Sequence, residues 1–235
     1  SLFGYDYTYN DLGIAHRISQ IEDKILLIMF SSPSCYYCKL FDKDVITNKS
    51  VQEFLRGNYV FVKIEPSSYK TTFLGKSYTN NDLFSAFGVR GTPTFVFIRN
   101  KESITQVPGY RPAEDFLKAL KYIIRVVEKN YKEPFDSYSK KSDDLKGYPK
   151  IVNVDKANSE YILKYDKNAQ LVSDLPKDID VYKVYVTKDE DVAKKLVELG
   201  AIRVLLVKWG AENESSFYSR YLCICCDSLR VTFVF

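Results

Sequence analysis

Histidine is almost absent from this chain of 235 residues, which contains only His16. Chemistry that needs several imidazoles is therefore excluded, and a Ser-His-Asp or Cys-His mechanism would have to use His16 itself. Apolar residues recur at helical spacing on both sides of it, from Leu12 to Ile21. This pattern favours the simpler interpretation of a partly exposed histidine on a helix.

Long apolar runs and blocks of one charge sign are also missing. The longest apolar stretches, residues 25–30 and 204–207, have the length of strands, and none approaches the roughly 20 residues that cross a bilayer. The 34 basic and 30 acidic residues are interspersed and give a net charge of +4. The sequence therefore predicts no membrane span in this chain and disfavours nucleic-acid binding.

Cysteine is scarce as well, with two residues early in the chain and three late: Cys35, Cys38, Cys223, Cys225 and Cys226. They are too few and too clustered for a disulfide scaffold. The late group has three interpretations. It is a buried apolar segment in which cysteine acts as a small hydrophobe, the site of an extra disulfide, or a thiol relay from the early pair.

Helix and strand patterns alternate over the first 129 residues. Helices are predicted over 10–23, 36–56, 79–87 and 112–129, strands over 24–30, 58–65, 95–98 and 103–107, and a loop over 66–78. We expect Ser50 to cap a second helical piece within 36–56, Thr79 to open a capping box with Asp82, and Pro112 to begin the last helix. This order predicts an α/β fold with a central mixed sheet and helices on both faces.

The early cysteines come after a predicted buried strand and a short Ser-Ser-Pro-Ser break, and they lie at the predicted start of a helix. Free N–H groups and the helix dipole stabilise a thiolate at that point, so Cys35 is the predicted nucleophile. Cys38 lies one turn further and can close a disulfide or resolve a mixed one. The alternatives are a structural disulfide, or a zinc site shared with Cys223 and Cys226, which have the same C-x-x-C spacing.

Three segments, residues 30–39, 87–97 and 108–117, together resemble the thioredoxin fold of bacterial thioredoxin-like and thiol–disulfide interchange proteins, over residues 10–128. The resemblance implies thiol–disulfide oxidoreductase activity. It also implies a cis Thr92–Pro93 bond that faces the cysteines, where the backbone before the proline pairs with an extended substrate. We assign four residues to substrate binding: Tyr36, Tyr37, Thr92 and Pro93.

This sequence departs from thioredoxin at two positions. Met29 stands where thioredoxin buries an acid, and Ser34 replaces the tryptophan before the first cysteine. Glu65 is the candidate proton acceptor for Cys38 in place of that acid. Tyr37 and Thr92 are similar to the corresponding residues of bacterial periplasmic disulfide isomerases, which favours reductase or isomerase work on folding proteins.

The second half begins with a polar stretch, residues 130–149, whose composition predicts a linker. Beyond it we predict strands over 150–154, 180–187 and 201–209 and a helix over 189–200, ended by Gly200. This pattern indicates a small α/β domain with a parallel strand pair. It is weakly similar to rhodanese domains but has no cysteine after the strand ending near 186, so sulfur transfer is not supported; a redox-inactive thioredoxin-like unit is the alternative.

These observations predict a redox domain over 1–129, a linker over 130–149 and a docking or dimerisation domain over 150–235. The predicted function is disulfide exchange with protein substrates and a redox partner protein, without a cofactor or metal, and with homodimerisation through the C-terminal domain. The alternative is a non-catalytic peptide- or partner-binding module. The isomerase-like pair and a start at Ser1 rather than Met favour an extracytoplasmic, periplasmic setting over a cytoplasmic one.

Overall fold

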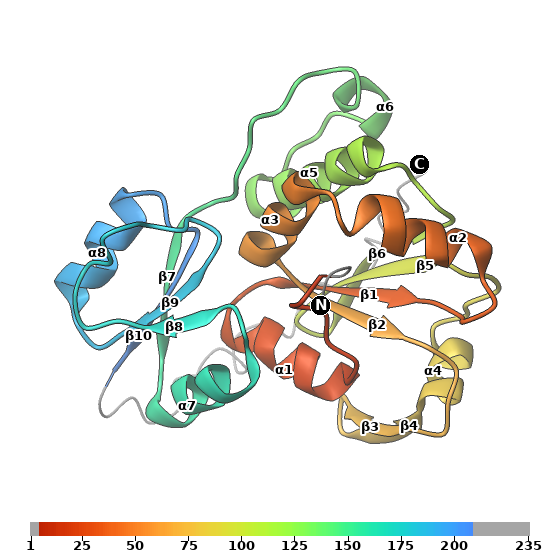
Figure 1. The fold of residues 1–235 in the computed structure, drawn as a ribbon, viewed down its shortest axis with the longest axis horizontal. Helices are drawn as coiled ribbons and strands as arrows, with labels where there is room; N and C mark the ends of the chain where they lie inside the picture. The colour runs from red at the N-terminus through yellow and green to blue at the C-terminus, as the bar shows by residue number, and fades with distance from the viewer. Residues whose placement is uncertain (1–4, 209–235) are drawn as a thin grey trace, which may run out of the picture.

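The computed structural model describes residues 5–208, which form two α/β units packed against each other (Figure 1). The first unit contains, in chain order, α1 (Leu12–Ile21), β1 (Ile25–Phe30), α2 (Tyr36–Leu40), the π-helix η1 (Phe41–Val45), α3 (Lys49–Asn58), β2 (Tyr59–Ile64), β3 (Lys70–Phe73), β4 (Lys76–Thr79), α4 (Asn80–Ala86), β5 (Thr94–Arg99), β6 (Glu102–Pro108) and α5 (Ala113–Lys129). There follow α6 (Phe135–Tyr138), β7 (Lys150–Val154), α7 (Lys156–Tyr165), β8 (Ala169–Leu171), β9 (Val184–Thr187), α8 (Glu190–Glu198) and β10 (Arg203–Val207).

The first sheet has the strand order β2-β1-β5-β6. Strands β1 and β2 are parallel, whereas β1–β5 and β5–β6 are antiparallel. This is the mixed sheet that the sequence predicts. All six side chains of β1 are buried, because the strand is internal and both faces of the sheet are covered.

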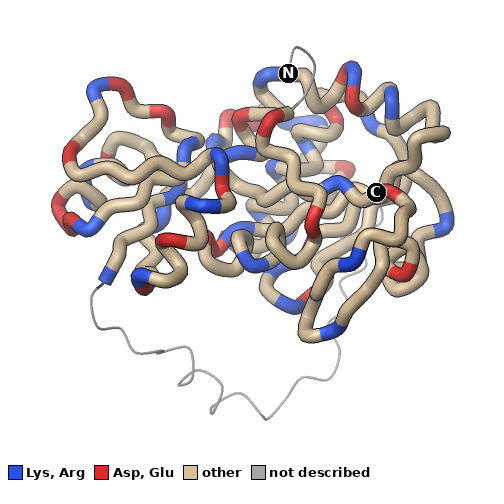
Figure 2. Tube along the Cα trace, turned by 60° about the horizontal axis from the view of Figure 1, so that its bottom comes forward, with Lys and Arg blue, Asp and Glu red and all other residues tan. Residues whose placement is uncertain are grey.

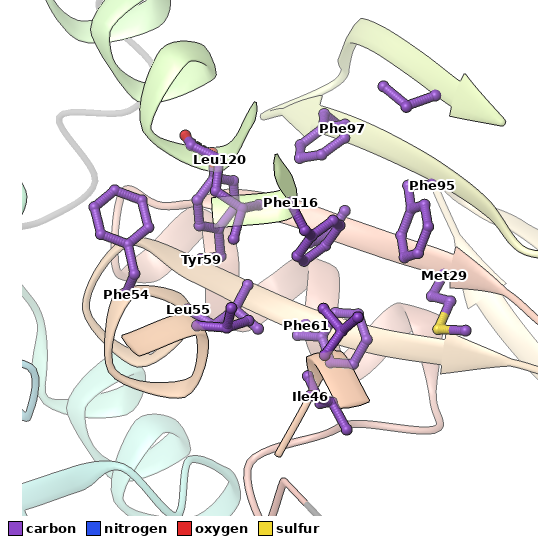
Figure 3. Close-up of a cluster of buried hydrophobic side chains, with 14 of the residues drawn as sticks. Met29, Ile46, Phe54, Leu55, Tyr59, Phe61, Phe95, Phe97, Phe116 and Leu120 are labelled. Carbon is purple, nitrogen blue, oxygen red and sulfur yellow. Dashed lines mark hydrogen bonds between the residues drawn. The ribbon is translucent and has the colours of Figure 1, made fainter. Parts of the chain in front are cut away.

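Alternation along β1 divides its side chains between two cores. Ile25, Leu27 and Met29 point into a cluster formed with residues of α3 and α5 (Figure 3). Leu26 and Ile28 point to the opposite face, where α1 packs. The central strand thereby holds the helices of both faces, and its carboxyl end carries the loop to α2.

The second sheet has the order β7-β10-β9-β8, and its strands are all parallel. The predicted β-α-β unit is confirmed as β9, α8 and β10. Helix α8 covers one face of this sheet. The other face shares a core with the first unit, since Ile162 of α7 and Val186 of β9 join Leu12 of α1 in one apolar cluster.

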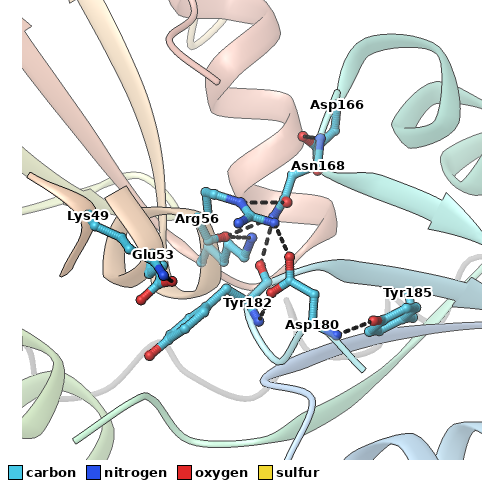
Figure 4. Close-up of polar contacts among 9 residues, drawn as sticks. Lys49, Glu53, Arg56, Asp166, Asn168, Asp180, Tyr182 and Tyr185 are labelled. Carbon is cyan, nitrogen blue, oxygen red and sulfur yellow. Dashed lines mark hydrogen bonds and ion pairs between the residues drawn. The ribbon is translucent and has the colours of Figure 1, made fainter. Parts of the chain in front are cut away.

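A polar contact reinforces the junction at Arg56, near the end of α3 (Figure 4). Its Nε donates to Asn168 Oδ1 over 3.1 Å, and its Nη2 donates to Asp180 Oδ2 over 2.5 Å. Asn168 Nδ2 in turn donates to the carbonyl oxygens of Arg56 and Tyr182. The guanidinium thus links the helix of one unit to two loops of the other.

Residues 130–149 connect the units and pack against the first. Asp143 anchors the connection, because both of its oxygens accept hydrogen bonds from Arg125 of α5, over 2.6 and 2.7 Å. Lys121 Nζ donates to the Asp143 carbonyl, and Asn58 Nδ2 to that of Lys146. The predicted linker therefore follows a defined path, while the domain boundaries drawn around it remain a prediction.

The prediction of a loop over residues 66–78 was wrong in part. Strands β3 and β4 form an antiparallel hairpin there. Leu74 and Gly75 both have positive φ angles, +50° and +78°, as the tight turn requires. Phe73 is buried against the edge of the His16 ring, so packing on α1 stabilises strands whose own pattern is weak.

Other predicted boundaries also moved. Asn48 caps α3, not Ser50, since Asn48 Oδ1 accepts from the N–H groups of Ser50 and Val51. Pro112 is the N-cap residue of α5, which begins one residue later, whereas the capping box of Thr79 and Asp82 is confirmed. The strand predicted from Asp180 begins only at Val184, because Asp180 Oδ1 accepts the N–H of Tyr182 and holds a turn.

The Nε2 atom of His16 lies 2.5 Å from the carbonyl oxygen of Asn100, and the side chain is buried rather than partly exposed.

Elements α7 and β8, between residues 156 and 171, were not predicted. Basic and acidic residues are interspersed along the described chain, as Figure 2 shows. No helix within residues 5–208 is long and apolar enough to cross a membrane.

Candidate active site

The loop after β1 delivers Cys35 to the head of α2. Cys35 is the N-cap residue of this helix, and its Sγ accepts a hydrogen bond from the Cys38 N–H over 3.1 Å. The Cys35 N–H donates to the Ser32 carbonyl, which closes the loop behind it. The expected placement of the early cysteines, after a buried strand and at a helix start, is confirmed.

Cys35 and Cys38 form a disulfide, with their Cα atoms 5.3 Å apart. The two sulfurs differ in access, because Cys35 is partly exposed whereas Cys38 is only 1% exposed and packs in the apolar core. A thiolate approaching from solvent therefore meets Cys35 first. This asymmetry is what a nucleophilic and a resolving cysteine require.

The segment before β5 lies directly against the disulfide. The Thr92–Pro93 peptide bond is cis, the geometry that the resemblance implies. Cys35 Sγ lies 3.3 Å from the Thr92 carbonyl oxygen. A groove of about 470 Å³ lies beside this segment, and its lining includes Arg90, Thr92, Pro93, Gln106 and Pro108.

The two tyrosines between the cysteines face solvent. Tyr36 is 70% exposed and Tyr37 is 55% exposed. Tyr37 stacks on Tyr110, which follows β6, with ring centroids 6.0 Å apart and planes inclined by 29°. The structure thus places all four predicted substrate-binding residues around Cys35. It also places Tyr110 there, which was not predicted because no local pattern shows that residue 110 stacks on residue 37.

The predicted proton acceptor Glu65 has another partner. Its carboxylate lies 3.5 Å from Lys63 Nζ, which also donates to Asp42 Oδ2 over 2.7 Å. Met29 is buried in the same apolar cluster as Cys38. A role for Glu65 at Cys38 therefore stays a prediction, and the surroundings of Cys38 are mainly apolar.

The late cysteines and their three interpretations lie outside the described residues, as does the shared zinc site. Within residues 5–208, no group of three or more His, Cys, Asp or Glu side chains is arranged to hold a metal ion. The chemistry that this geometry supports is thiol–disulfide exchange at the Cys35–Cys38 pair.

Comparison with known families supports the predicted fold of the first half of the chain. Residues 15–124 match the family model described as a thioredoxin-like domain. This part of the chain therefore has a thioredoxin-like fold. The predicted fold is therefore confirmed, and the domain contains Cys35, Cys38, the cis Thr92–Pro93 bond and Tyr110.

Curated relatives of the thioredoxin-like domain carry names from disulfide chemistry. A candidate protein disulfide-isomerase of Schizosaccharomyces pombe is 24% identical over 52% of this chain, and the thiol:disulfide interchange protein DsbD of Campylobacter jejuni is 25% identical over 49% of it. The aligned parts span only 23% and 19% of those proteins. A thioredoxin from Thermus thermophilus is 22% identical, with a TM-score of 0.43, over 54% of this chain and 95% of that structure.

Proposed function

We propose that this chain is a thiol–disulfide oxidoreductase that exchanges disulfides with protein substrates through Cys35 and Cys38. The observation that carries the proposal is the disulfide at the head of α2, with Cys35 accessible, Cys38 buried and the cis Thr92–Pro93 segment against Cys35. The names of the curated relatives support the same reaction class.

In the reducing direction the dithiol form reacts first. The Cys35 thiolate attacks one sulfur of a substrate disulfide, so that a Cys35–substrate bond forms and the second substrate sulfur leaves as a thiolate, which takes a proton from water. The Cys38 thiolate then attacks Cys35 Sγ and displaces the first substrate sulfur. Two electrons pass to the substrate, and a dithiol donor, in the cell a redox partner protein, must return them.

The residues around Cys35 have separate roles in this proposal. The Cys38 N–H, 3.1 Å from Cys35 Sγ, stabilises negative charge on that sulfur when it attacks or leaves. Thr92 and Pro93 form one wall beside the sulfur, and the backbone of Thr92 orients an extended substrate. Tyr36 and Tyr37 supply exposed aromatic surface to the substrate side chains.

Reductase or isomerase work is the finer part of the proposal, favoured by Tyr37 and Thr92. The docking or dimerisation role of residues 150–235 and the extracytoplasmic setting stay predictions. Reductase and isomerase activity both depend on Cys35, so one pair of assays tests the proposal.

The test is reduction of insulin disulfides by dithiothreitol and refolding of a scrambled disulfide protein, each with wild type and Cys35→Ser. We expect the wild type to accelerate both reactions and Cys35→Ser to reduce the acceleration to the background rate. Equal rates for the two proteins would refute the proposed activity. Retention of cellular function by Cys35→Ser would instead favour the binding module.

A further inference from the structure

The disulfide is flanked by the most exposed large apolar side chain of the described residues. Tyr36 is 70% exposed, and its ring meets that of Tyr37 edge-on at a centroid distance of 5.4 Å. Tyr37 in turn stacks on Tyr110. These three rings, the tyrosine platform, form a continuous aromatic surface next to the sulfur that reacts.

Tyr110 is fixed to this surface by the backbone. It follows Gly109, which has a φ of +88° and donates its N–H to the Pro93 carbonyl over 2.8 Å. A side chain at residue 109 would be strained in this conformation, so glycine is what allows the chain to turn here. Tyr110 also packs on the apolar core beneath. The turn that holds the cis-proline segment therefore also holds the third ring.

The occupant of the tyrosine platform is restricted by its position. Any molecule that exchanges a disulfide must bring a sulfur to Cys35, whose Sγ lies 3.3 Å from the Thr92 carbonyl oxygen. Thr92 and Pro93 line the groove, and Tyr36 of the platform directly follows Cys35 in the chain. Exposed apolar surface of this kind marks interaction sites in soluble proteins. An extended polypeptide would place the side chain next to its cysteine on the rings.

We propose that the tyrosine platform of Tyr36, Tyr37 and Tyr110 selects polypeptide substrates that carry an aromatic or branched aliphatic side chain next to the reactive cysteine. This inference rests on the proposed function, because it assigns a substrate class to the same site. Ring–ring contact with an aromatic side chain favours reaction by about fivefold over a small polar side chain.

The test uses two peptides that differ only in Phe or Ser beside a single cysteine, each joined through a disulfide to thionitrobenzoate. Pre-reduced protein is mixed with each peptide in a single turnover. Cys35 attacks the peptide sulfur, the peptide–thionitrobenzoate bond breaks, and thionitrobenzoate leaves as a coloured thiolate. Its absorbance gives the second-order rate constant, and the mixed disulfide of glutathione with thionitrobenzoate, in which glutathione has no apolar side chain, serves as the reference substrate.

Three variants separate the platform from the chemistry. Tyr110→Ala should reduce the Phe-to-Ser rate ratio from about fivefold to about one, and Tyr110→Phe should retain it. Tyr69→Ala is the matched control, since Tyr69 is a 52% exposed tyrosine whose hydroxyl bonds Asp11. Circular dichroism and urea unfolding show whether Tyr110→Ala has folded, and the rate with the glutathione substrate gives the reference value for each variant. Tyr110 lies outside the C-x-x-C motif, so we expect Tyr110→Ala to leave the reduction potential of the Cys35–Cys38 pair unchanged.

The outcomes are distinguishable. Equal wild-type rates for the Phe and Ser peptides, or a ratio that Tyr110→Ala leaves intact, would overturn the proposal. A dimer in sedimentation experiments that Tyr110→Ala converts to a monomer would also overturn it, because a second copy would then cover the platform. If no substrate reacts faster with wild type than with Cys35→Ser, the proposed function itself fails.

Discussion

At the scale of single residues, the difference in access between the sulfurs of Cys35 and Cys38 predicts the order of steps in the proposed disulfide exchange. Cys35 is partly exposed and caps α2, whereas Cys38 is 1% exposed within the core. In the proposed exchange reaction an external thiolate or disulfide is therefore expected to react at Cys35, and Cys38 to attack only Cys35. Covalent intermediates with a substrate should form only through Cys35.

Replacement of the resolving cysteine should trap that intermediate. We expect Cys38→Ser to accumulate a mixed disulfide with a protein substrate, because Cys35 can still attack but no internal thiolate displaces the substrate. Mass spectrometry under non-reducing conditions measures the adduct, and Cys35→Ser is the control that should form none. Normal turnover by Cys38→Ser would show that Cys38 is not the resolving residue.

At the scale of elements, one carboxylate ties the connection of residues 130–149 to α5. Asp143 accepts two hydrogen bonds from Arg125, one from the Tyr138 hydroxyl and one from the Leu145 N–H. Burial alone would raise the pKa of Asp143, but the hydrogen bonds from Arg125 and Tyr138 outweigh it and hold this pKa well below its usual range. The charged carboxylate is thus the form that fits the fold.

We expect Asp143→Asn to lower the free energy of unfolding by about 2 kcal/mol at pH 7, the typical value for hydrogen bonds to charged groups. Because the folded pKa is depressed, this stabilisation is complete above the unfolded pKa of about 4 and is lost as the pH falls through the folded value. Urea unfolding of both proteins at pH 7 and near pH 3 measures the difference, which should shrink in acid.

Asp144→Asn provides the matched control for this tie, since Asp144 is an exposed neighbour in the same segment. It should leave the free energy of unfolding nearly unchanged at both pH values. A loss as large as that of Asp143→Asn would mean that the general charge of the segment matters rather than the contact with Arg125.

At the scale of the whole molecule, the two units meet through a shared apolar core and a buried group of charges. Glu22, fully buried after α1, lies 3.0 Å from Lys24 Nζ. On the other side of the junction, Asp166 accepts a hydrogen bond from Tyr9 over 3.0 Å. Burial, followed by the charge of Asp166, raises the pKa of Glu22 well above its usual value, against the opposing effect of Lys24.

This raised pKa predicts how stability changes with pH. The folded state holds the Glu22 proton more tightly than the unfolded chain, so stability falls as the pH rises from the unfolded pKa of about 4.3 to the folded value. Glu22→Gln removes this titration. The free energy of unfolding of Glu22→Gln, measured by urea unfolding relative to that of the wild type, should therefore increase as the pH rises from 5 to 8.

Glu102→Gln, at an exposed position on β6, is the control and should show the pH dependence of the wild type. A constant difference between Glu22→Gln and wild type over this pH range would contradict a shifted titration at the junction.

Local patterns in the sequence were sufficient for the redox motif and most of the first sheet. The continuous apolar run of β1 indicates burial on both faces, and the Ser-Ser-Pro-Ser break after it indicates a helix start at Cys35. The capping box of Thr79 and Asp82 is equally local, because its contacts lie within three residues. Such features depend on near neighbours, which the sequence displays directly.

Only the tertiary structure decided which distant residues meet. Tyr110 stacks on Tyr37 across the active site, and Phe73 packs on α1 so that a predicted loop forms a hairpin. Asp166 belongs to the second unit, yet its charge raises the pKa of Glu22 in the first. Periodicity gives the face of an element but not its partner. The sequence by itself therefore determined a C-x-x-C pair on a thioredoxin-like sheet, whereas packing between distant segments determined the tyrosine platform and the charged junction.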